Sequence, residues 1–519
     1  MMNDIKKELN NEKGTTENGA IGYKTTGNAL LDINFRVSSL RKMSEDDIYN
    51  LFINAFLENK LYAIKWLFFM RDIRGGLGER RSFRVIVNRL AYNYPLLVKQ
   101  LISIIPEYGR FDDLWCLLDT DLRDDVVKYC YLLLLDDIKK TSHNKPISLL
   151  AKWLPSYTYN KSTLENSPKK RLNNYYAKIL MNGFNLSVEG YCKTLKKLRR
   201  YLDVVECKMS ENRWDDINYS TVPSKANLIY SNAFMKNDQK RRLEFLESLK
   251  DGNNKINASV LFPHDIVHKY TIVDWFNMKT DKYDESIEQM WKSLPHIVNN
   301  ESTICVRDDS ASMSISMGGK SNVTALEIAT SLSIYFSETL TGEYKNKYIS
   351  FSSNPKFIDM SQCKSLKEKL DLSYAHSEVS NNDIYKVFKL ILDVAIKNNY
   401  KQEDLPNNIL ILSDMEFDEG VLCKTDNTLF DRIQREYAES GYNLPKLIFW
   451  NICGRTNVVP IKENDKGVIL VSGFSINIIK MIMNGENDPL QCLIKQLNSL
   501  RYDLVEEAYV KYEKQNIFR

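Results

Sequence analysis

An apolar strand that runs directly into acidic and hydroxyl side chains constrains this chain more than any other feature. The segment Ile304–Met313 reads ICVRDDSASM, so Asp308, Ser310 and Ser312 follow the strand at alternate positions. Hard divalent cations such as Mg²⁺ bind small sets of oxygen ligands, and one turn here offers a carboxylate and two hydroxyls. The segment therefore predicts a strand that ends in a metal-binding loop.

Helices and strands alternate after this loop. Helical spacing of apolar residues is found over 321–340, 383–397 and 429–440, and short apolar strands are expected at 348–351, 408–413, 446–450 and 467–471. Such alternation is typical of a parallel sheet with helices on both faces. We therefore expect a doubly wound α/β domain over residues 296–485.

In parallel sheets of this kind, ligands bind at the carboxyl ends of the strands. Asp414 directly follows one predicted strand, and the segment 381–383, Asn-Asn-Asp, opens a predicted helix. The arrangement resembles the von Willebrand factor A domain, whose metal-ion-dependent adhesion site uses Asp-x-Ser-x-Ser, a Thr and a later Asp. The resemblance implies Mg²⁺, or another divalent cation such as Mn²⁺, and a ligand set that consists of Asp308, Ser310, Ser312, Asn382 and Asp414. Asn382 stands where the family has Thr, which puts the affinity for metal in doubt.

A purely structural interpretation of the same residues stays open. Asp308 and Asp414 could cap turns, while the serines hydrogen-bond to backbone groups. The match of several strands, helices and oxygen-bearing residues to a metal-binding sheet domain would then be accidental.

The region before residue 295 differs in character from the predicted sheet domain. Apolar residues recur at three-to-four spacing over 46–56, 61–70, 81–90, 95–105 and 124–139, with short turns between. Stacked helix pairs of this kind form solenoids. We expect a flexible N-terminal segment over 1–22, a helical-repeat, solenoid-like scaffold over 23–295 and a C-terminal helical extension over 486–519. The expected fold class is thus multidomain, all-α followed by α/β.

Length and composition agree with folded domains. The chain has 519 residues, which exceeds one core of ordinary size, and 43% of them are hydrophobic. Its nine cysteines are scattered without a C-x-x-C pair, which suits a reducing compartment. The N-terminus is charged and no apolar run reaches membrane-spanning length. We therefore expect an intracellular, cytoplasmic protein without a membrane partner.

Local signatures along nearly the whole chain carry a second resemblance. They include 71–80 (RDIRGGLGER), 108–114 (YGRFDDL), 149–155 (LLAKWLP), 219–225 (YSTVPSK), 262–265 (FPHD) and 412–418 (LSDMEFD). These resemble an uncharacterised domain family of viral, bacterial and plant proteins, so a virus-infected host cell is one expected setting. That family is similar in plan to the Ro autoantigen (TROVE) proteins, in which a ring of helical repeats is closed by a von Willebrand A domain. The resemblance implies binding of small or misfolded RNA.

Two groups of basic residues make RNA binding plausible on chemical grounds. One is the cluster Lys169, Lys170, Arg171, Lys196, Lys197, Arg199 and Arg200, which is interleaved with tyrosines; the other is the glycine-containing segment with Arg71, Arg74, Arg80, Arg81 and Arg84. Cations neutralise phosphates, and aromatic rings stack on unpaired bases. The alternatives are a solvated helix face for the first group and a glycine turn with internally paired arginines for the second.

The function we expect is a non-catalytic RNA-binding scaffold, with a metal-dependent site for an acidic protein partner. One alternative is a protein-interaction adaptor that does not bind RNA. Another is a Mg²⁺-dependent nuclease in which Asp308, Asp309, Asp383 and Asp414 hold the metal. Two of the ligands nearest the metal would be neutral serines, and no nearby Lys or His offers itself as a base, which favours binding over catalysis.

Overall fold

The structure falls into two compact units that interleave along the chain. The computed structural model describes residues 13–274, 277–297, 301–317, 322–351, 355–377, 384–417, 429–456, 458–459, 467–482 and 488–517. Unit 1 takes the described residues of Met1–Trp66, Pro223–Leu228 and Leu246–Ser499, and unit 2 takes those of Leu67–Val222, Ile229–Phe245 and Leu500–Arg519. The expected domain boundaries follow chain order, whereas each unit combines remote segments. Local sequence patterns do not carry this information, because it depends on packing between segments that are far apart in the chain.

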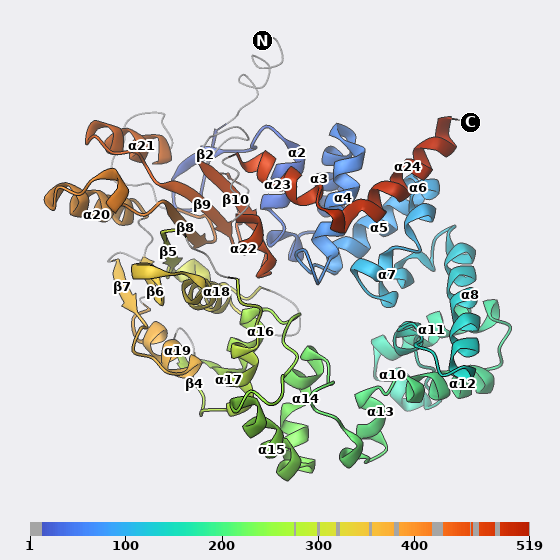
Figure 1. Ribbon diagram of the computed structural model, residues 1–519. Coiled ribbons are helices and arrows are strands. Elements are labelled where there is room, and N and C mark those ends of the chain that lie inside the picture. The colour runs from blue at the N-terminus through green and yellow to red at the C-terminus, as the bar shows by residue number, and fades with distance from the viewer. Residues whose placement is uncertain are drawn as a thin grey trace. The chain divides into compact units, whose positions relative to one another are not determined.

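A six-stranded mixed sheet forms the centre of unit 1 (Figure 1). In chain order its strands are β5 (Thr303–Asp308), β6 (Lys347–Phe351), β7 (Lys356–Asp359), β8 (Asn408–Ser413), β9 (Lys446–Asn451) and β10 (Val468–Ser472). Their spatial order is β10-β9-β8-β5-β6-β7, and every neighbouring pair is parallel except β6 and β7. The carboxyl ends of five strands therefore meet at one edge.

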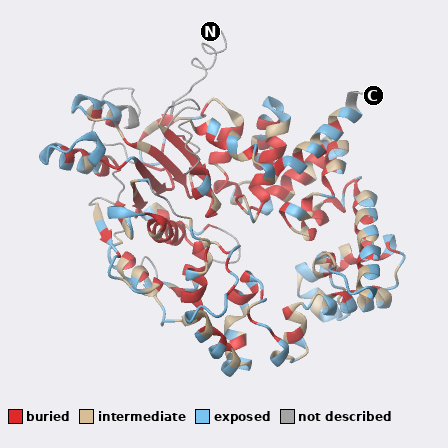
Figure 2. Ribbon diagram, in the orientation of Figure 1, coloured by how far each residue is buried: buried red, intermediate tan, exposed pale blue. Residues whose placement is uncertain are grey.

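The strands expected at 348–351, 408–413, 446–450 and 467–471 are confirmed to within about one residue. All residues of β8 and β10 are buried, as expected for strands covered on both faces (Figure 2). The antiparallel edge strand β7 was not anticipated. It lacks an apolar run, and Phe357 within it is 62% exposed.

Unit 1 also contains helices, several of which pack on the sheet. They are α2 (Ala29–Phe35), α3 (Glu45–Glu58), α16 (Pro263–Tyr270), α17 (Glu285–Lys292), α18 (Ala325–Thr339), α19 (Leu366–Ala375), α20 (Ile384–Lys397), α21 (Leu429–Glu439), α22 (Asn477–Ile482) and α23 (Pro489–Leu497). Nearly every residue of α18 is buried, and this helix packs on β5 and β6. The hydroxyl of Thr324 accepts a hydrogen bond from the backbone N of Glu327, and the carboxylate of Glu327 accepts one from the backbone N of Thr324. This capping box fixes where α18 begins.

An N-terminal hairpin also belongs to unit 1. Its strands are β1 (Lys13–Thr15) and β2 (Ile21–Tyr23), which pair antiparallel. Tyr23 exchanges backbone hydrogen bonds with Val459, at 2.8 and 2.7 Å. Residues 13–22 belong to the segment that was expected to be flexible; instead, backbone hydrogen bonds within the hairpin and to Val459 hold them in place. Residues 1–12 lie outside the described part of the chain.

Unit 2 is helical in the residues that the structure describes. Its helices are α5 (Arg81–Asn93), α6 (Pro95–Leu101), α7 (Ile105–Tyr108), α8 (Arg123–Ser142), α9 (Leu150–Trp153), α10 (Lys161–Glu165), α11 (Pro168–Gly183), α12 (Val188–Tyr201), α13 (Val205–Ser210) and α24 (Asp503–Ile517). The division between the units falls within α4 (Lys60–Arg71), α14 (Ser224–Asn237) and α15 (Gln239–Lys250). The helices expected at 46–56, 61–70, 81–90 and 124–139 are confirmed.

The single helix expected over 95–105 is wrong, because the chain forms α6 and α7 with a break between them. Pro106 lies in the first turn of α7. Proline lacks a backbone N–H, and in a continuous helix its ring would clash with the carbonyl four residues earlier, that of Ile102, the C-cap residue at which α6 ends.

The C-terminal extension was expected to be helical, and it is. Its last helix, α24, packs on α6 in unit 2. Just before it, Arg501 donates to Asp72 at 2.8 Å and to Glu107 at 2.9 Å, and the rings of Tyr502 and Tyr108 stack with centroids 5.8 Å apart. The final residues of the chain thus complete a unit that begins at Leu67. No helix in the described residues is long and apolar enough to cross a membrane.

Candidate functional site

Neighbouring strands bring the predicted metal ligands to one edge of the sheet in unit 1. β5 ends at Asp308 and the adjacent parallel strand β8 ends at Ser413, with Arg307 paired to Leu412 just before those ends. Asp414 follows β8 directly. The carboxyl ends of parallel strands therefore place Asp308 and Asp414 side by side, as the sequence led us to expect.

Asp308 is fully buried and its carboxylate is held from two sides. Its Oδ1 accepts a hydrogen bond from the backbone N of Ser310 at 2.9 Å. Its Oδ2 accepts one from the hydroxyl of Ser413 at 2.6 Å. The hydroxyls of Ser310 and Ser312 lie 2.8 Å apart, so the oxygens of the Asp-x-Ser-x-Ser segment form one compact group.

Asp414 is also fully buried, and one of its oxygens is poorly satisfied. Its Oδ1 accepts a hydrogen bond from the backbone N of Glu416 at 3.2 Å. Its Oδ2 accepts no hydrogen bond, although the Nη2 atom of Arg455 lies 3.3 Å away. A buried carboxylate oxygen without a donor costs free energy and is therefore a candidate position for a cation.

The electrostatics of the two carboxylates agree with this geometry. Burial, and then the nearby charge of Asp414, raise the pKa of Asp308 to about 7, although Ser413 and Ser310 act against this rise. Burial likewise raises the pKa of Asp414, against the opposing effects of Ser312 and Arg455. Two carboxylates that share a buried site cannot both ionise freely unless a cation neutralises them.

Asp309 is turned away from this group. It lies in a buried ion pair with Arg307, whose Nη2 donates to Oδ2 of Asp309 at 2.7 Å and whose Nε lies 2.7 Å from Oδ1. Successive side chains of a strand point to opposite faces, which explains why Asp308 and Asp309 have different surroundings. Asn382 and Asp383 lie outside the described residues. Within the described ranges, no group of three or more His, Cys, Asp or Glu side chains could hold a metal ion, so any cation here would depend on the serine hydroxyls as well.

Residues that the sequence did not single out surround the candidate site. Arg455 pairs with Asp414 and also with Glu17 of the N-terminal hairpin, at 2.8 Å. The carboxylate of Glu416 accepts hydrogen bonds from the backbone N of Arg455 and of Thr456, at 2.6 and 2.8 Å, and from the backbone N of Glu17 at 3.0 Å. The position of Arg455 after β9, the neighbouring strand, could have indicated its role. No local signal marks Glu17.

The glycine-containing segment of unit 2 uses several of its arginines internally. Arg71 is buried, and its Nη2 lies 2.7 Å from a carboxylate oxygen of Asp113. Arg84 approaches the other oxygen of Asp113, also at 2.7 Å, and burial of Asp113 is outweighed by these two cations, which lower its pKa. Arg74 donates to the backbone oxygen of Glu107 at 2.7 Å. The alternative interpretation, a glycine turn with internally paired arginines, therefore describes much of this segment.

Arg80 and Arg81, the remaining arginines of this segment, lie at the start of α5. Partial burial and the neighbouring guanidinium of Arg110 lower the pKa of Arg80 to about 10. Arg80 thus lies close to other guanidinium groups beside the first turn of α5.

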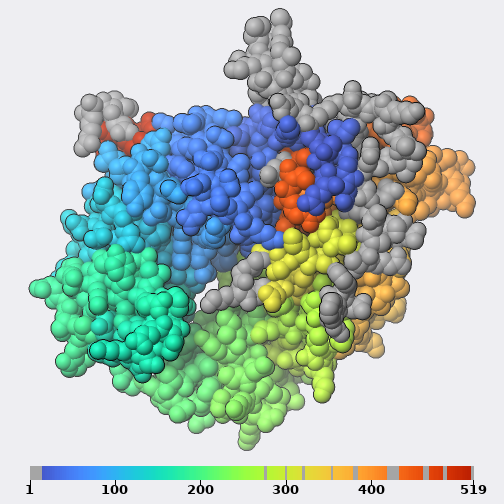
Figure 3. Space-filling model, turned by 180° about the vertical axis from the view of Figure 1, so that it is seen from behind, coloured from blue at the N-terminus to red at the C-terminus, as the bar shows by residue number. Residues whose placement is uncertain are grey.

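The basic cluster of α11 and α12 divides into two kinds of residue. Arg199 is structural: it donates to the backbone oxygens of Ala151 and Leu154 at 2.8 and 2.7 Å. Arg200 pairs with Glu211 at 3.0 Å, and Arg171 donates to the backbone of α10. Lysines on the same two helices are exposed and have no ion-pair partner among the described residues: Lys169, Lys170, Lys178, Lys196 and Lys197. Helices α8 to α12 form one continuous lobe of the surface in Figure 3.

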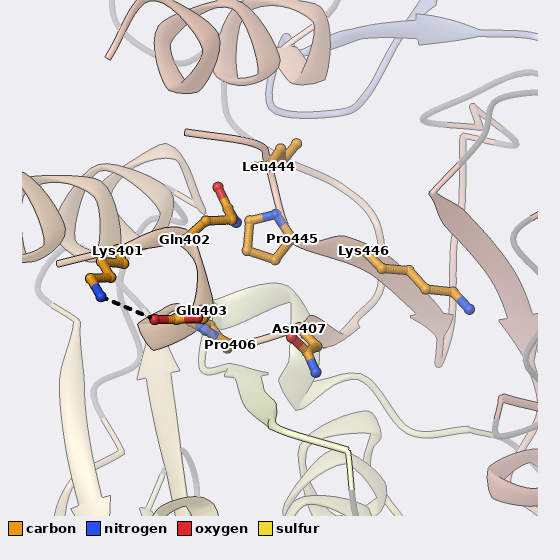
Figure 4. Close-up of a pocket in the computed structure, with 8 residues that line it drawn as sticks. All are labelled: Lys401, Gln402, Glu403, Pro406, Asn407, Leu444, Pro445 and Lys446. Carbon is orange, nitrogen blue, oxygen red and sulfur yellow. Dashed lines mark ion pairs between the residues drawn. The ribbon is translucent and has the colours of Figure 1, made fainter. Parts of the chain in front are cut away.

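A wide hollow of about 650 Å³ lies at the opposite edge of the sheet from Asp308 (Figure 4). Its lining residues lie just before β8, or just before and at the first residue of β9; among them are Lys401 and Glu403, whose side chains pair at 3.5 Å, and Pro445. The hollow contributes nothing to the candidate metal site, which is formed at the carboxyl ends of these strands.

Two families of unknown function match the chain. Residues 302–513 match the domain of unknown function DUF7788, and residues 132–304 match the domain of unknown function DUF2828. Uncharacterized protein L728 of Acanthamoeba polyphaga mimivirus is 27% identical over 93% of this chain and 86% of its own length. These matches support the expected relation to an uncharacterised domain family with a viral representative.

A solved structure was also compared. The Ro (RSR) protein of Deinococcus radiodurans has 12% sequence identity and a TM-score of 0.34, with 86% of this chain and 91% of that chain covered. A TM-score of this size does not show a shared fold.

Proposed function

We propose that this chain is a non-catalytic binding protein whose unit 1 contains a von Willebrand A-like domain with a divalent cation site. The observation that carries the proposal is the convergence of Asp308, Ser310, Ser312 and Asp414 at the carboxyl edge of the sheet. The strand order with one antiparallel edge strand is compatible with this fold.

The residues fit Mg²⁺ or Mn²⁺ on chemical grounds. All four supply oxygen, which hard cations prefer. A cation would relieve the raised pKa of Asp308, and it would give Oδ2 of Asp414, which has an ion pair with Arg455 but accepts no hydrogen bond, a further partner. Asn382 remains the expected further ligand, through its amide oxygen.

The donor set favours capture of an anion over activation of water. The two carboxylates carry the same amount of charge as a divalent cation, but Arg455 adds one positive charge 3.3 Å from Asp414 and the serine hydroxyls add none, so the occupied site would keep a net positive charge. A bound cation supplies an electrophilic position that an acidic side chain of a partner protein can occupy. The nuclease alternative loses one of its expected ligands, because Asp309 is committed to Arg307.

Metal binding can be tested by calorimetric titration of the full chain with MgCl₂ and MnCl₂. Asp414→Asn should lower the affinity at least tenfold, because it removes one of two charged ligands, a difference of ~1.4 kcal/mol or more. Asp393→Asn is the matched control, since Asp393 is half exposed and pairs with Lys389 on α20. Equal titration curves for all three proteins would refute the proposed site.

RNA binding by unit 2 is our second candidate, and the exposed lysines of α11 and α12 favour it. Lys196 and Lys197 have no acidic partner among the described residues, so they can neutralise phosphates. The resemblance to the Ro plan, which rests on sequence signatures, points the same way. If RNA does not bind, the adaptor alternative remains with the metal site alone.

The test is recovery of the tagged protein from its native cell and sequencing of the RNA that co-purifies. The double variant Lys196→Glu with Lys197→Glu should lose enriched RNAs. Lys236→Glu with Lys240→Glu is the matched control, since both lysines are exposed and lie in unit 2. Equal enrichment in both double variants would remove this patch from the proposal, and background RNA in every sample would leave the adaptor.

A further inference from the structure

A cavity of about 290 Å³ in unit 1 has a composition that its own fold does not explain. It is lined by the end of α17, the end of α18, the start of α19 and the turn before β6. Helix α19 packs on both α17 and α18, and the indole of Trp291 on α17 donates to Glu338 on α18. Lys345 and Asn346 precede β6, so the cavity lies toward the amino end of that strand, away from Asp308.

Both acidic side chains of the cavity are already satisfied by the protein. Glu338 accepts hydrogen bonds from the indole N–H of Trp291, at 3.0 and 3.1 Å to its two oxygens, and from Lys369 at 2.6 Å. Glu288 accepts from the backbone N of Leu366 at 2.8 Å and caps the first turn of α19. Neither carboxylate is available to neutralise further cations.

Three lysines of the cavity remain without such a partner. Lys292 comes from α17, Lys345 from the turn before β6 and Lys364 from the approach to α19. Their side chains are exposed and make no ion pair with any described residue. His296 also lines the cavity. With Lys369 included, four lysines face two glutamates, so the cavity carries an excess of two positive charges.

Like charges brought together from separate elements repel one another, which costs free energy unless something neutralises them. A single row of lysines on one helix would be an ordinary solvated face. Here the three come from separate stretches of the chain and converge on one concavity. The hydroxyl of Ser365, at the same rim, accepts a bond from Glu368 N and keeps its own hydrogen to donate.

We propose that this cavity binds a small phosphorylated molecule, with its phosphate group against Lys292, Lys345 and Lys364. A phosphate dianion matches the excess of two charges, and lysine ammonium groups bind phosphate as point charges. A volume of about 290 Å³ is at the lower end of small-molecule sites, which excludes a folded macromolecule as the occupant. The site is independent of the proposed metal and RNA sites.

The test is titration of the full chain with inorganic phosphate, pyrophosphate and adenosine monophosphate, followed by calorimetry and by thermal melting at constant ionic strength. Sodium acetate at equal ionic strength is the control for general salt effects. Phosphate compounds should raise the melting temperature and acetate should not. Tighter binding of the nucleotide than of inorganic phosphate would show that the cavity also holds the organic part, whereas equal binding would assign the phosphate group alone.

Variants separate this site from nonspecific charge. Lys345→Gln and Lys364→Gln should each weaken binding by about tenfold, since each removes one charge-assisted contact. Lys401→Gln is the matched control, because Lys401 lines the separate hollow of Figure 4 and should leave binding unchanged. Equal weakening by all three variants, or no binding of any phosphate compound, would overturn the proposal. Binding of an RNA oligonucleotide at these lysines without binding of small phosphates would also overturn it.

Discussion

Asp308→Asn should stabilise the metal-free protein and at the same time abolish its response to Mg²⁺. In the folded protein the pKa of Asp308 is raised from 3.8 to about 7, mainly by burial and then by Asp414. Above pH 7 the folded state must therefore hold an ionised group that it disfavours, whereas the unfolded chain ionises it without cost. An asparagine at this position has no charge to bury.

The size of the effect follows from the linkage between protonation and folding. A folded pKa of about 7 against 3.8 corresponds to ~4 kcal/mol of lost stability at pH 8, taken as an upper limit. This loss is absent below pH 3.8, grows as the pH rises from 3.8 to about 7, and stays constant above about 7. Part of the gain from asparagine is offset, because the hydrogen bond from Ser413 to a carboxylate is replaced by a weaker one. We expect a net increase in the free energy of unfolding of ~1–3 kcal/mol at pH 8 and little difference near pH 4.

Urea denaturation in EDTA and in MgCl₂, each at pH 8 and at pH 5, measures both consequences. The parent protein should gain stability with Mg²⁺ at pH 8, and Asp308→Asn should not. Asp393→Asn, on the exposed face of α20, should behave like the parent under all four conditions. If Asp308→Asn were less stable than the parent in EDTA at pH 8, the argument from buried repulsion would be refuted. If Asp308→Asn still gained stability with Mg²⁺, the assignment of Asp308 as a metal ligand would be refuted.

Other consequences can be checked directly. Arg71→Met should cost ~1.5–3 kcal/mol in urea denaturation, because it removes one of the two cations that bind the buried carboxylate of Asp113 and leaves Arg84 alone. Gly76→Ala should lower the melting temperature markedly, since an added Cβ would collide with the backbone oxygen of Phe69; a melting temperature equal to the parent's would contradict this packing. If RNA binds, the double variant Lys196→Glu with Lys197→Glu should reduce the slope of log affinity against log salt by ~1.4 or more, and an unchanged slope would mean that neither lysine contacts phosphate.

Local sequence patterns predicted the elements of unit 1 well because their signals are local. β8 is a continuous apolar run, and α20 and α21 carry strong helical spacing of apolar residues. The relation between Asp308 and Asp414 could also be predicted, because parallel strands in a sheet bring their carboxyl ends to one edge. Two residues more than a hundred positions apart could thus be placed together from topology alone.

The remaining features depend on contacts between segments that no local pattern links. Glu17 reaches Arg455 across more than four hundred residues of sequence, and Arg501 returns to Asp72 over a similar separation. The arginines around Gly76 gave an ambiguous signal, since a basic glycine-rich turn can either bind phosphate or pair internally. The buried ion pair of Arg71 with Asp113 shows that Arg71 pairs internally.

The charges of the candidate site are balanced in this structure by a residue from outside the predicted motif. Arg455 lies 3.3 Å from Asp414 and 2.8 Å from Glu17, so one guanidinium links a buried carboxylate to the N-terminal hairpin. The carboxylate of Glu416, two residues after Asp414, accepts hydrogen bonds from the backbone N–H groups of both Glu17 and Arg455. A cation near Asp414 would repel Arg455, and the hairpin would lose part of what holds Glu17 in place. Occupancy of the proposed site and the position of the N-terminal hairpin are therefore linked through the same two charges.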